Sequence, residues 1–339
     1  MTNLISVYVG TTVIYWSAIV ICLGVCAWFC LSSALYTAAG GRVTAMWVCL
    51  PLGCVLSLAF SRFLHWYCHV EQYTGLAGAF SDLGLGSYCM PGVLLGVILA
   101  AVIVWVFRLA PSLPPLLDAL APGAALGIAI IRLSAPFNSS CRGTIIITDP
   151  RYQRLPLGSG VSAGSGGVEY HFATFFVYFL LLMALTVLLL VFYFRSRRRR
   201  LKSGPRHGHT AILFLLLYSA MDLVLDSTRY DSSFFRSNGF VSVAQIISAL
   251  CILAILAYYS AHSIRANGLR LYHWIIWAVY LATVGGTGYL EYLVQRHGNW
   301  YLACYSGMSV CCAAMALTVC CMYRTLLAPP PTRHLKKAE

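Results

Sequence analysis

Charged residues are scarce in this chain. Asp, Glu, Lys and Arg make up 10% of its 339 residues, whereas an average soluble domain carries about 25%. Hydrophobic residues make up 60%. This balance excludes an ordinary soluble domain and predicts an integral membrane protein.

Three further signatures are missing. Residues 1–9 carry no basic segment ahead of the first apolar run, so we expect no cleavable signal peptide. The 14 cysteines lie mostly within apolar runs, and none has zinc-ligand spacing with histidines, so we predict small apolar fillers and neither metal nor cofactor. We find no convincing internal repeats, which disfavours a secondary transporter.

Long apolar runs recur along the whole chain, each near the roughly 20 residues that cross a bilayer. They predict an all-α polytopic helical bundle with nine spans, at residues 10–35, 46–67, 88–108, 116–134, 171–195, 210–228, 240–263, 271–292 and 301–323. The fourth contains Pro122 and Gly123, so a re-entrant half-helix is its alternative. Gly92 and Gly96 have the spacing of a close helix contact.

Basic residues orient these spans. With the N-terminus outside, 15 of the 23 Lys and Arg lie on inner segments, seven of them between residues 195 and 206, and 8 lie outside. The positive-inside rule therefore predicts an external N-terminus and an internal C-terminus. The net charge of +13 suits an anionic lipid surface better than nucleic acid.

A polar segment follows the fourth apolar run. Arg132 ends the run, Pro136 stops the helix, and Ser134, Asn138 and Ser140 lie close by. An arginine beside irregular backbone suits a phosphate head group, because its donors can bind two oxygens at once. The alternative is an arginine that extends to the lipid surface.

Carboxylates also occur within a predicted span. Asp222 and Asp226 stand one helical turn apart, and Arg229 follows. A charge in a span costs roughly 2.5–3.5 kcal/mol and usually marks function. The alternative is a structural Asp226–Arg229 pair.

The second span ends in Arg62, His65, His69 and Glu71. A histidine near a carboxylate could accept a proton, although an interfacial polar cap or a histidine metal pair would also fit. Beyond the fourth span, residues 144–148 predict a short strand, and the rest of 144–168 predicts either a mobile flap or a loop without a role.

In this order, the polar residues resemble the prolipoprotein diacylglyceryl transferase family. Asp118-Ala-Leu-Ala-Pro122, followed by Arg132, is similar to that family's Asp-x-x-Ala-Pro…Arg helix. The likeness extends over roughly residues 46–262 and also includes Arg62, Asn138, Gly143, His171, Tyr218, Asp226, Arg229 and Gln245. It implies a seven-helix core at residues 1–264, followed by two further transmembrane helices at 265–326 and a basic cytoplasmic tail at 327–339.

The chain also departs from the family pattern. The signature's first two glycines are replaced by Ile131 and Ser134, its first asparagine by Ala135 and its glutamate by Ser140. The family's His-Gly-Gly becomes Pro91-Gly92-Val93. Arg132, Asn138 and Arg229, which could bind a phosphate, are retained.

The resemblance implies transfer of a diacylglyceryl group from phosphatidylglycerol to the lipobox cysteine of an exported prolipoprotein, in a bacterial cytoplasmic (inner) membrane. We predict a catalytic group comprising Arg132, Arg229, His171 and His65. We predict a substrate-binding group comprising Arg62, Asn138, Ser140, Gly143, Tyr218 and Asp226. The alternatives are an inactive protein of the same fold that binds anionic lipid or exported peptide, and a transporter.

Overall fold

The structure is a computed structural model of the whole chain. It describes residues 6–9, 12–81, 88–137, 143–153, 156–162, 167–203, 208–234, 239–298 and 300–327.

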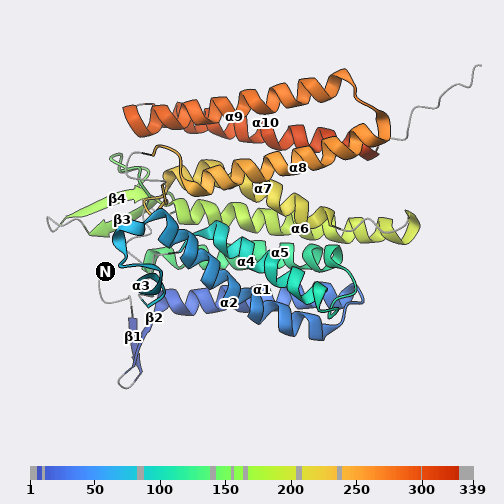
Figure 1. The fold of residues 1–339 in the computed structure, drawn as a ribbon. Helices are drawn as coiled ribbons and strands as arrows, with labels where there is room; N and C mark the ends of the chain where they lie inside the picture. The colour runs from blue at the N-terminus through green and yellow to red at the C-terminus, as the bar shows by residue number, and fades with distance from the viewer. Residues whose placement is uncertain are drawn as a thin grey trace, which may run out of the picture.

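Helices dominate the fold, and each predicted span corresponds to one of them. The long helices are α1 (Trp16–Ala38), α2 (Val43–Cys68), α4 (Met90–Val106), α5 (Leu113–Arg132), α6 (Thr174–Ser203), α7 (His209–Leu225), α8 (Val243–Asn267), α9 (Leu271–His297) and α10 (Tyr301–Leu327). Seven of them are long and apolar enough to cross a membrane, whereas α4 has 17 residues. The chain is an all-α polytopic membrane protein (Figure 1).

The first span begins later than predicted. Strands β1 (Ser6–Val9) and β2 (Thr12–Tyr15) form an antiparallel hairpin, and α1 starts only at Trp16. Both strands are rich in β-branched and aromatic residues, which favour extended backbone. Apolar character alone did not distinguish this hairpin from the helix that follows.

Helix α5 lies at the centre of the first half of the bundle. It is continuous from Leu113 to Arg132 despite Pro122, so it is a full-length helix and not a re-entrant half. It contacts α1, α6 and α7, and its buried face carries small residues such as Ala121, Ala125 and Ala129. Small side chains allow neighbouring helices to approach closely, and this packing fixes where Arg132 emerges.

Helices α2 and α4 pack through glycine, as the sequence predicted. A Cβ on Gly92 would lie 2.5 Å from the Cα of Ser61, and one on Gly96 would lie 2.4 Å from the backbone nitrogen of Ser57. Serines of α2 then donate to backbone carbonyls on the α4 side, with Ser57 Oγ 2.8 Å from the Val93 oxygen and Ser61 Oγ 2.9 Å from that of Cys89.

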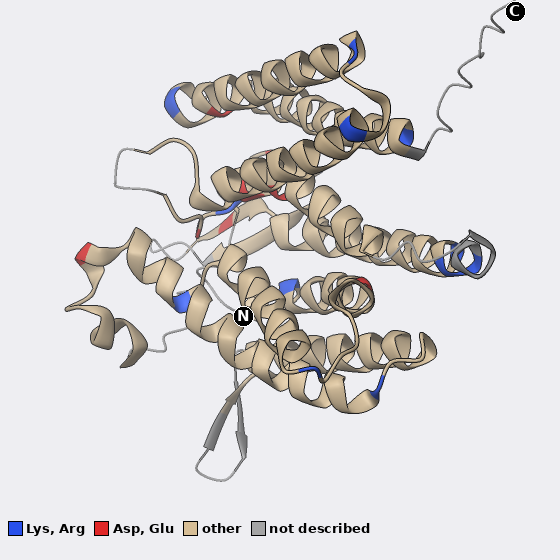
Figure 2. Ribbon diagram, turned by 45° about the vertical axis from the view of Figure 1, so that its right-hand side comes forward, with Lys and Arg blue, Asp and Glu red and all other residues tan. Residues whose placement is uncertain are grey.

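Helices α9 and α10 form a hairpin that packs on the second half of the bundle. Helix α10 contacts both α7 and α8, and in Figure 1 the hairpin lies along the outer side of α8. Met315 and Met322 of α10 are buried in one cluster with Ile252 and Leu256 of α8. Most charged segments lie near helix ends or in connecting loops, and the middles of the long helices are mostly uncharged (Figure 2).

Irregular backbone and a small sheet cover one end of the bundle. Strands β3 (Gly158–Ser162) and β4 (Val168–Phe172) are antiparallel. The predicted strand at residues 144–148 is present only as isolated pairing, in which Ile147 N donates to the Tyr170 oxygen and Phe172 N donates to the Ile145 oxygen, both at 2.8 Å. These contacts join the loop to β4, directly ahead of α6.

Replacement of Gly96 by valine tests the α2–α4 contact. The added side chain meets backbone atoms that cannot rotate away, so Gly96→Val should lower the free energy of unfolding by about 1–3 kcal/mol, as measured by unfolding in mixed micelles. The control is Gly285→Val, because a Cβ at that glycine of α9 has no neighbour within 4 Å. Equal stability of the two variants would contradict the contact.

Candidate functional site

A cavity of about 190 Å³ opens between the ends of several helices, on the side of the bundle that carries β3 and β4. Its polar lining consists of Ser17, Tyr88, Arg132, Ser134, Thr174, Tyr178, Arg229 and Asp231. Ile21, Met90, Ile131, Ala135 and Phe175 complete it. The cavity is therefore amphipathic, with two cations beside an apolar wall.

Arg132 is the last residue of α5 and the least satisfied cation of this cavity. Its guanidinium carbon lies 4.1 Å from the centroid of the buried Tyr178 ring, a cation–π distance. Its Nε and Nη2 atoms are buried, and neither has a hydrogen-bond partner among the described residues. Because buried charged donors without acceptors are costly, these two nitrogens favour an anionic ligand.

Arg229 lies at the same cavity but is already engaged. Its Nε and Nη2 donate to the two carboxylate oxygens of Asp231, at 2.9 and 2.7 Å. Its Nη1 donates to Asp226 Oδ1 at 3.1 Å. The Asp226–Arg229 pair, raised above as a structural alternative, is therefore present, and a ligand would meet Arg229 with Asp231 already bound to it.

Asp231 is an ionised group in the cavity wall. Burial by itself would raise its pKa, but the neighbouring Arg229 guanidinium outweighs burial, and the pKa of Asp231 is lowered from its usual value. The described residues that line the cavity thus carry two positive charges and one negative charge at neutral pH.

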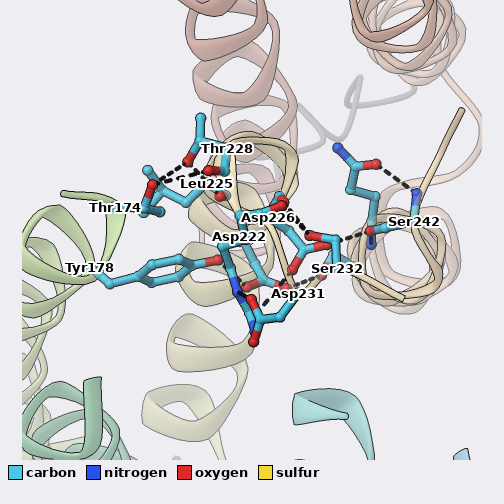
Figure 3. A network of polar contacts seen from close by, with 12 residues as sticks. Thr174, Tyr178, Asp222, Leu225, Asp226, Thr228, Asp231, Ser232 and Ser242 are labelled. Carbon is cyan, nitrogen blue, oxygen red and sulfur yellow. Dashed lines mark hydrogen bonds and ion pairs between the residues drawn. The ribbon is translucent and has the colours of Figure 1, made fainter. Parts of the chain in front are cut away.

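A polar network behind the cavity holds these groups in place (Figure 3). The Tyr178 hydroxyl donates to Asp222 Oδ1 at 2.8 Å, so the ring that stacks on Arg132 is fixed from α7. Ser242 Oγ, at the start of α8, donates to Asp226 Oδ2. Thr174 Oγ1 and Thr228 Oγ1 lie 2.9 Å apart. Helices α6, α7 and α8 therefore meet at this network.

Two further predicted residues, Tyr218 and Gly143, have defined positions near the arginines. Tyr218 is buried in α7, and Asp222, Arg132 and Arg229 all act on it electrostatically. Its hydroxyl makes no hydrogen bond of good geometry with the described residues, but Arg132 lies close enough to act on it as a weak hydrogen-bond donor. Gly143 forms a backbone bridge with Arg229, and a Cβ there would lie 2.3 Å from the Phe172 oxygen. Only glycine fits this position, so Gly143 shapes the backbone beside Arg229.

The candidate histidines lie elsewhere. His171 was expected to open the fifth span, but it lies in β4, and α6 begins at Thr174. Its Nδ1 donates to the Gly143 oxygen at 3.0 Å. His65 stacks on His69 with ring centroids 4.3 Å apart and contacts the Tyr73 hydroxyl at 3.0 Å. Neither His65 nor His171 is among the described residues that line the cavity.

Arg62 lies behind one wall of the cavity. It is buried, its Nε donates to the Ala79 oxygen at 2.6 Å, and its guanidinium carbon is 5.8 Å from the ring centroid of Tyr88. Tyr88 lines the cavity, whereas Arg62 does not. Asn138 and Ser140, which were predicted to bind substrate, lie outside the described residues.

Asp118 and Gln245 have structural roles that the sequence did not predict. The Asp118 carboxylate accepts hydrogen bonds from the backbone N–H groups of Gly208, Thr210 and Ala211, at 2.8, 2.8 and 3.1 Å. It therefore caps the first turn of α7 from α5. Gln245 completes a capping box with Ser242 at the start of α8. For Asp118, the available signal was an acidic residue near the start of a predicted apolar helix.

The fold and the cavity define a polytopic helical membrane protein with a site suited to an anionic group. The family model of prolipoprotein diacylglyceryl transferase matches residues 4–261, which is more than half of the chain. The chain therefore belongs to the prolipoprotein diacylglyceryl transferase family, whose members are transferases of lipoprotein biosynthesis. No match is found among curated proteins. The family match ends within α8, so α9 and α10 lie beyond it.

Removal of the Asp118 carboxylate tests the link between α5 and α7. Asp118→Ala leaves the N–H groups of Thr210 and Ala211 without this acceptor, and the free energy of unfolding should fall by about 1–2 kcal/mol. Hydrogen exchange at residues 208–211 should speed up in parallel. Asp149→Ala, at an exposed loop position, is the control. Unchanged exchange in the Asp118 variant would contradict the capping role.

Proposed function

We propose that this chain transfers a diacylglyceryl group from phosphatidylglycerol to the lipobox cysteine thiol of an exported precursor, and that the cavity at Arg132 holds the lipid phosphate. The observation that carries the proposal is the pair of buried, unsatisfied guanidinium nitrogens on Arg132. A phosphate diester offers two oxygens to such a fork. Family membership supplies the reaction class.

The apolar half of the cavity suits the rest of the donor lipid. Ile21, Met90, Ile131 and Phe175 line the wall beside the guanidinium groups. A phospholipid places its phosphate directly next to its glycerol and acyl chains, so cations beside an apolar wall match its outline. A free inorganic anion would make no use of that wall.

The reaction balances as a displacement at carbon. The cysteine sulfur forms a bond to the terminal carbon of the diacylglyceryl group, and the bond between that carbon and the phosphate oxygen breaks. Glycerol phosphate leaves with the bonding electron pair, and a base accepts the thiol proton. Arg132 would stabilise the charge that gathers on the leaving phosphate. A base is needed because a free thiol, with a pKa of about 8.5, is mostly protonated at neutral pH.

Arg229 would support Arg132 through the field of its charge, since Asp231 and Asp226 occupy its donors. Arg62, Tyr218 and Gly143 would shape the surroundings of the lipid. His65 and His171 remain the proposed candidates for the base, and each would need a water or a movement of the chain to reach the cavity.

The proposed topology follows from the ends of α6. Its first residue, Thr174, lines the cavity, and Arg195, Arg197 and Arg198 follow about 21–24 residues later, roughly 30–35 Å along the helix. With the basic end in the cytoplasm, the cavity lies at the outer face of the inner membrane, where exported precursors arrive.

Lipid binding without transfer is the second candidate. Its supporting observation is that neither candidate histidine lines the cavity among the described residues. Incubation of membranes with labelled phosphatidylglycerol and a lipobox peptide separates the two functions. Label on the peptide supports transfer, and retention of the lipid without label transfer supports binding alone.

Replacement of Arg132 by glutamine tests the proposed phosphate contact. The loss of a charged donor pair at a developing negative charge should reduce the transfer rate by about 100-fold or more. The control is Arg151→Gln, which removes an exposed arginine of the outer loop. Full transfer activity in Arg132→Gln membranes would exclude the proposed site.

Replacement of Asp231 by asparagine tests the charge balance of the cavity. The substitution keeps the shape of the side chain but removes the negative charge beside Arg229, so affinity for phosphatidylglycerol should rise about three- to fivefold. Binding of labelled lipid to the purified protein measures the change. Asp149→Asn should leave affinity unchanged. A weaker affinity in Asp231→Asn would show that Asp231 serves the lipid site in another way.

A further inference from the structure

A second cavity lies at the tip of the α9–α10 hairpin, and all of its described lining residues except Thr144 lie beyond the family match. Its volume is about 350 Å³, and the residues that line it include Thr144, Gln295, Arg296, His297, Tyr301 and Tyr305. None of its described lining residues is a carboxylate. The basic and hydroxyl groups make this cavity suited to an anion.

The backbone at the start of α10 also favours an anion at this cavity. Arg296 and His297 end α9, and Tyr301 begins α10. The first amides of a long helix have no partner within the helix and attract negative charge. The first backbone hydrogen bond of α10 runs from Cys304 N to the Trp300 oxygen, at 3.0 Å. The amides of the three residues before Cys304 therefore have no acceptor within the helix. The basic side chains and this helix end meet at one cavity.

The surroundings of the cavity indicate a lipid. Trp300 and Leu302 lie beside it in the chain and are 81% and 87% exposed. Trp300 also adopts a left-handed backbone conformation, with φ of 62°, which is rare for a bulky side chain. Exposed aromatic and apolar side chains next to cations are typical of the level of phospholipid head groups.

One nearby carboxylate has to be reconciled with an anion site. Glu291 lies one turn before Gln295 and is 2% exposed, and its Oε1 accepts a hydrogen bond from the Gln295 amide at 3.0 Å. It does not line the cavity. Gln295 therefore stands between this carboxylate and the cavity.

We propose that the α9–α10 hairpin builds a second phospholipid site, in which Arg296, His297 and Tyr301 bind the phosphate of an anionic lipid head group. The site is separate from the Arg132 cavity but joined to it by backbone. Thr144 lines the second cavity, its N–H donates to the Thr228 oxygen at 2.9 Å, and the adjacent Gly143 bridges to Arg229.

A charge series at Arg296 tests this site. We expect the affinity of the purified full chain for phosphatidylglycerol, measured by native mass spectrometry, to fall in the order Arg296→Lys, Arg296→Gln, Arg296→Glu. The glutamine variant should bind about fivefold more weakly, as expected for one basic side chain at a lipid surface. Arg265→Gln, at an exposed position of α8, should match the wild type.

Two further arms identify the ligand and separate this site from the first. Phosphatidylcholine and inorganic phosphate are the comparison probes. Wild-type protein should retain two phosphatidylglycerol molecules, and Arg132→Gln and Arg296→Glu should each retain one. The proposal is overturned if the Arg296 series binds phosphatidylglycerol like wild type, or if either comparison probe binds as tightly. An unchanged Arg132→Gln variant would count against the transferase site alone.

Discussion

The site depends on one buried cation that lacks its full set of acceptors. Arg132 is held at the end of α5 by the Tyr178 ring, and Tyr178 is held by Asp222. The C-terminal end of a helix favours positive charge, which offsets part of the cost of burial. Because Nε and Nη2 of Arg132 lack acceptors, the rest of the burial cost is not compensated. A ligand that supplies two negative oxygens would remove that cost, and the unsatisfied donors therefore favour an anion in this cavity.

Arg229 differs from Arg132 although both line one cavity. Two carboxylates occupy its donors, and one of them, Asp226, is also fixed by Ser242. These two carboxylates fix the position of Arg229 and weaken its electrostatic attraction for an anionic ligand. Arg132 is therefore available for direct contact with a ligand, whereas Arg229 acts on it through the electrostatic field of its charge. Sequence spacing could not separate these roles, because both residues follow apolar helices next to polar segments.

Apolar runs and glycine spacing predicted most of the fold. Every predicted span corresponds to a helix, and the contact at Gly92 and Gly96 is confirmed. The hairpin before Trp16 was missed because its β-branched apolar residues also suit a membrane span. The strand that holds His171 was missed because its aromatic residues directly precede the apolar run of α6. The shared cavity of Arg132 and Arg229 depends on which way α5 and α7 face, and the sequence fixes that only through contacts such as the Asp118 cap. The division of the chain at residue 264 stays a prediction.

A hydroxyl of the α9–α10 hairpin contacts the segment that holds Arg229. Tyr305 of α10 lines the second cavity, and its hydroxyl lies 3.3 Å from Ser227 Oγ. Ser227 directly follows Asp226, which accepts from Arg229. A head group bound at the hairpin would therefore contact a residue that touches the segment holding Arg229. Helices beyond the family match thus bear on the position of a residue within it, which gives a physical reason for their close packing against α7 and α8.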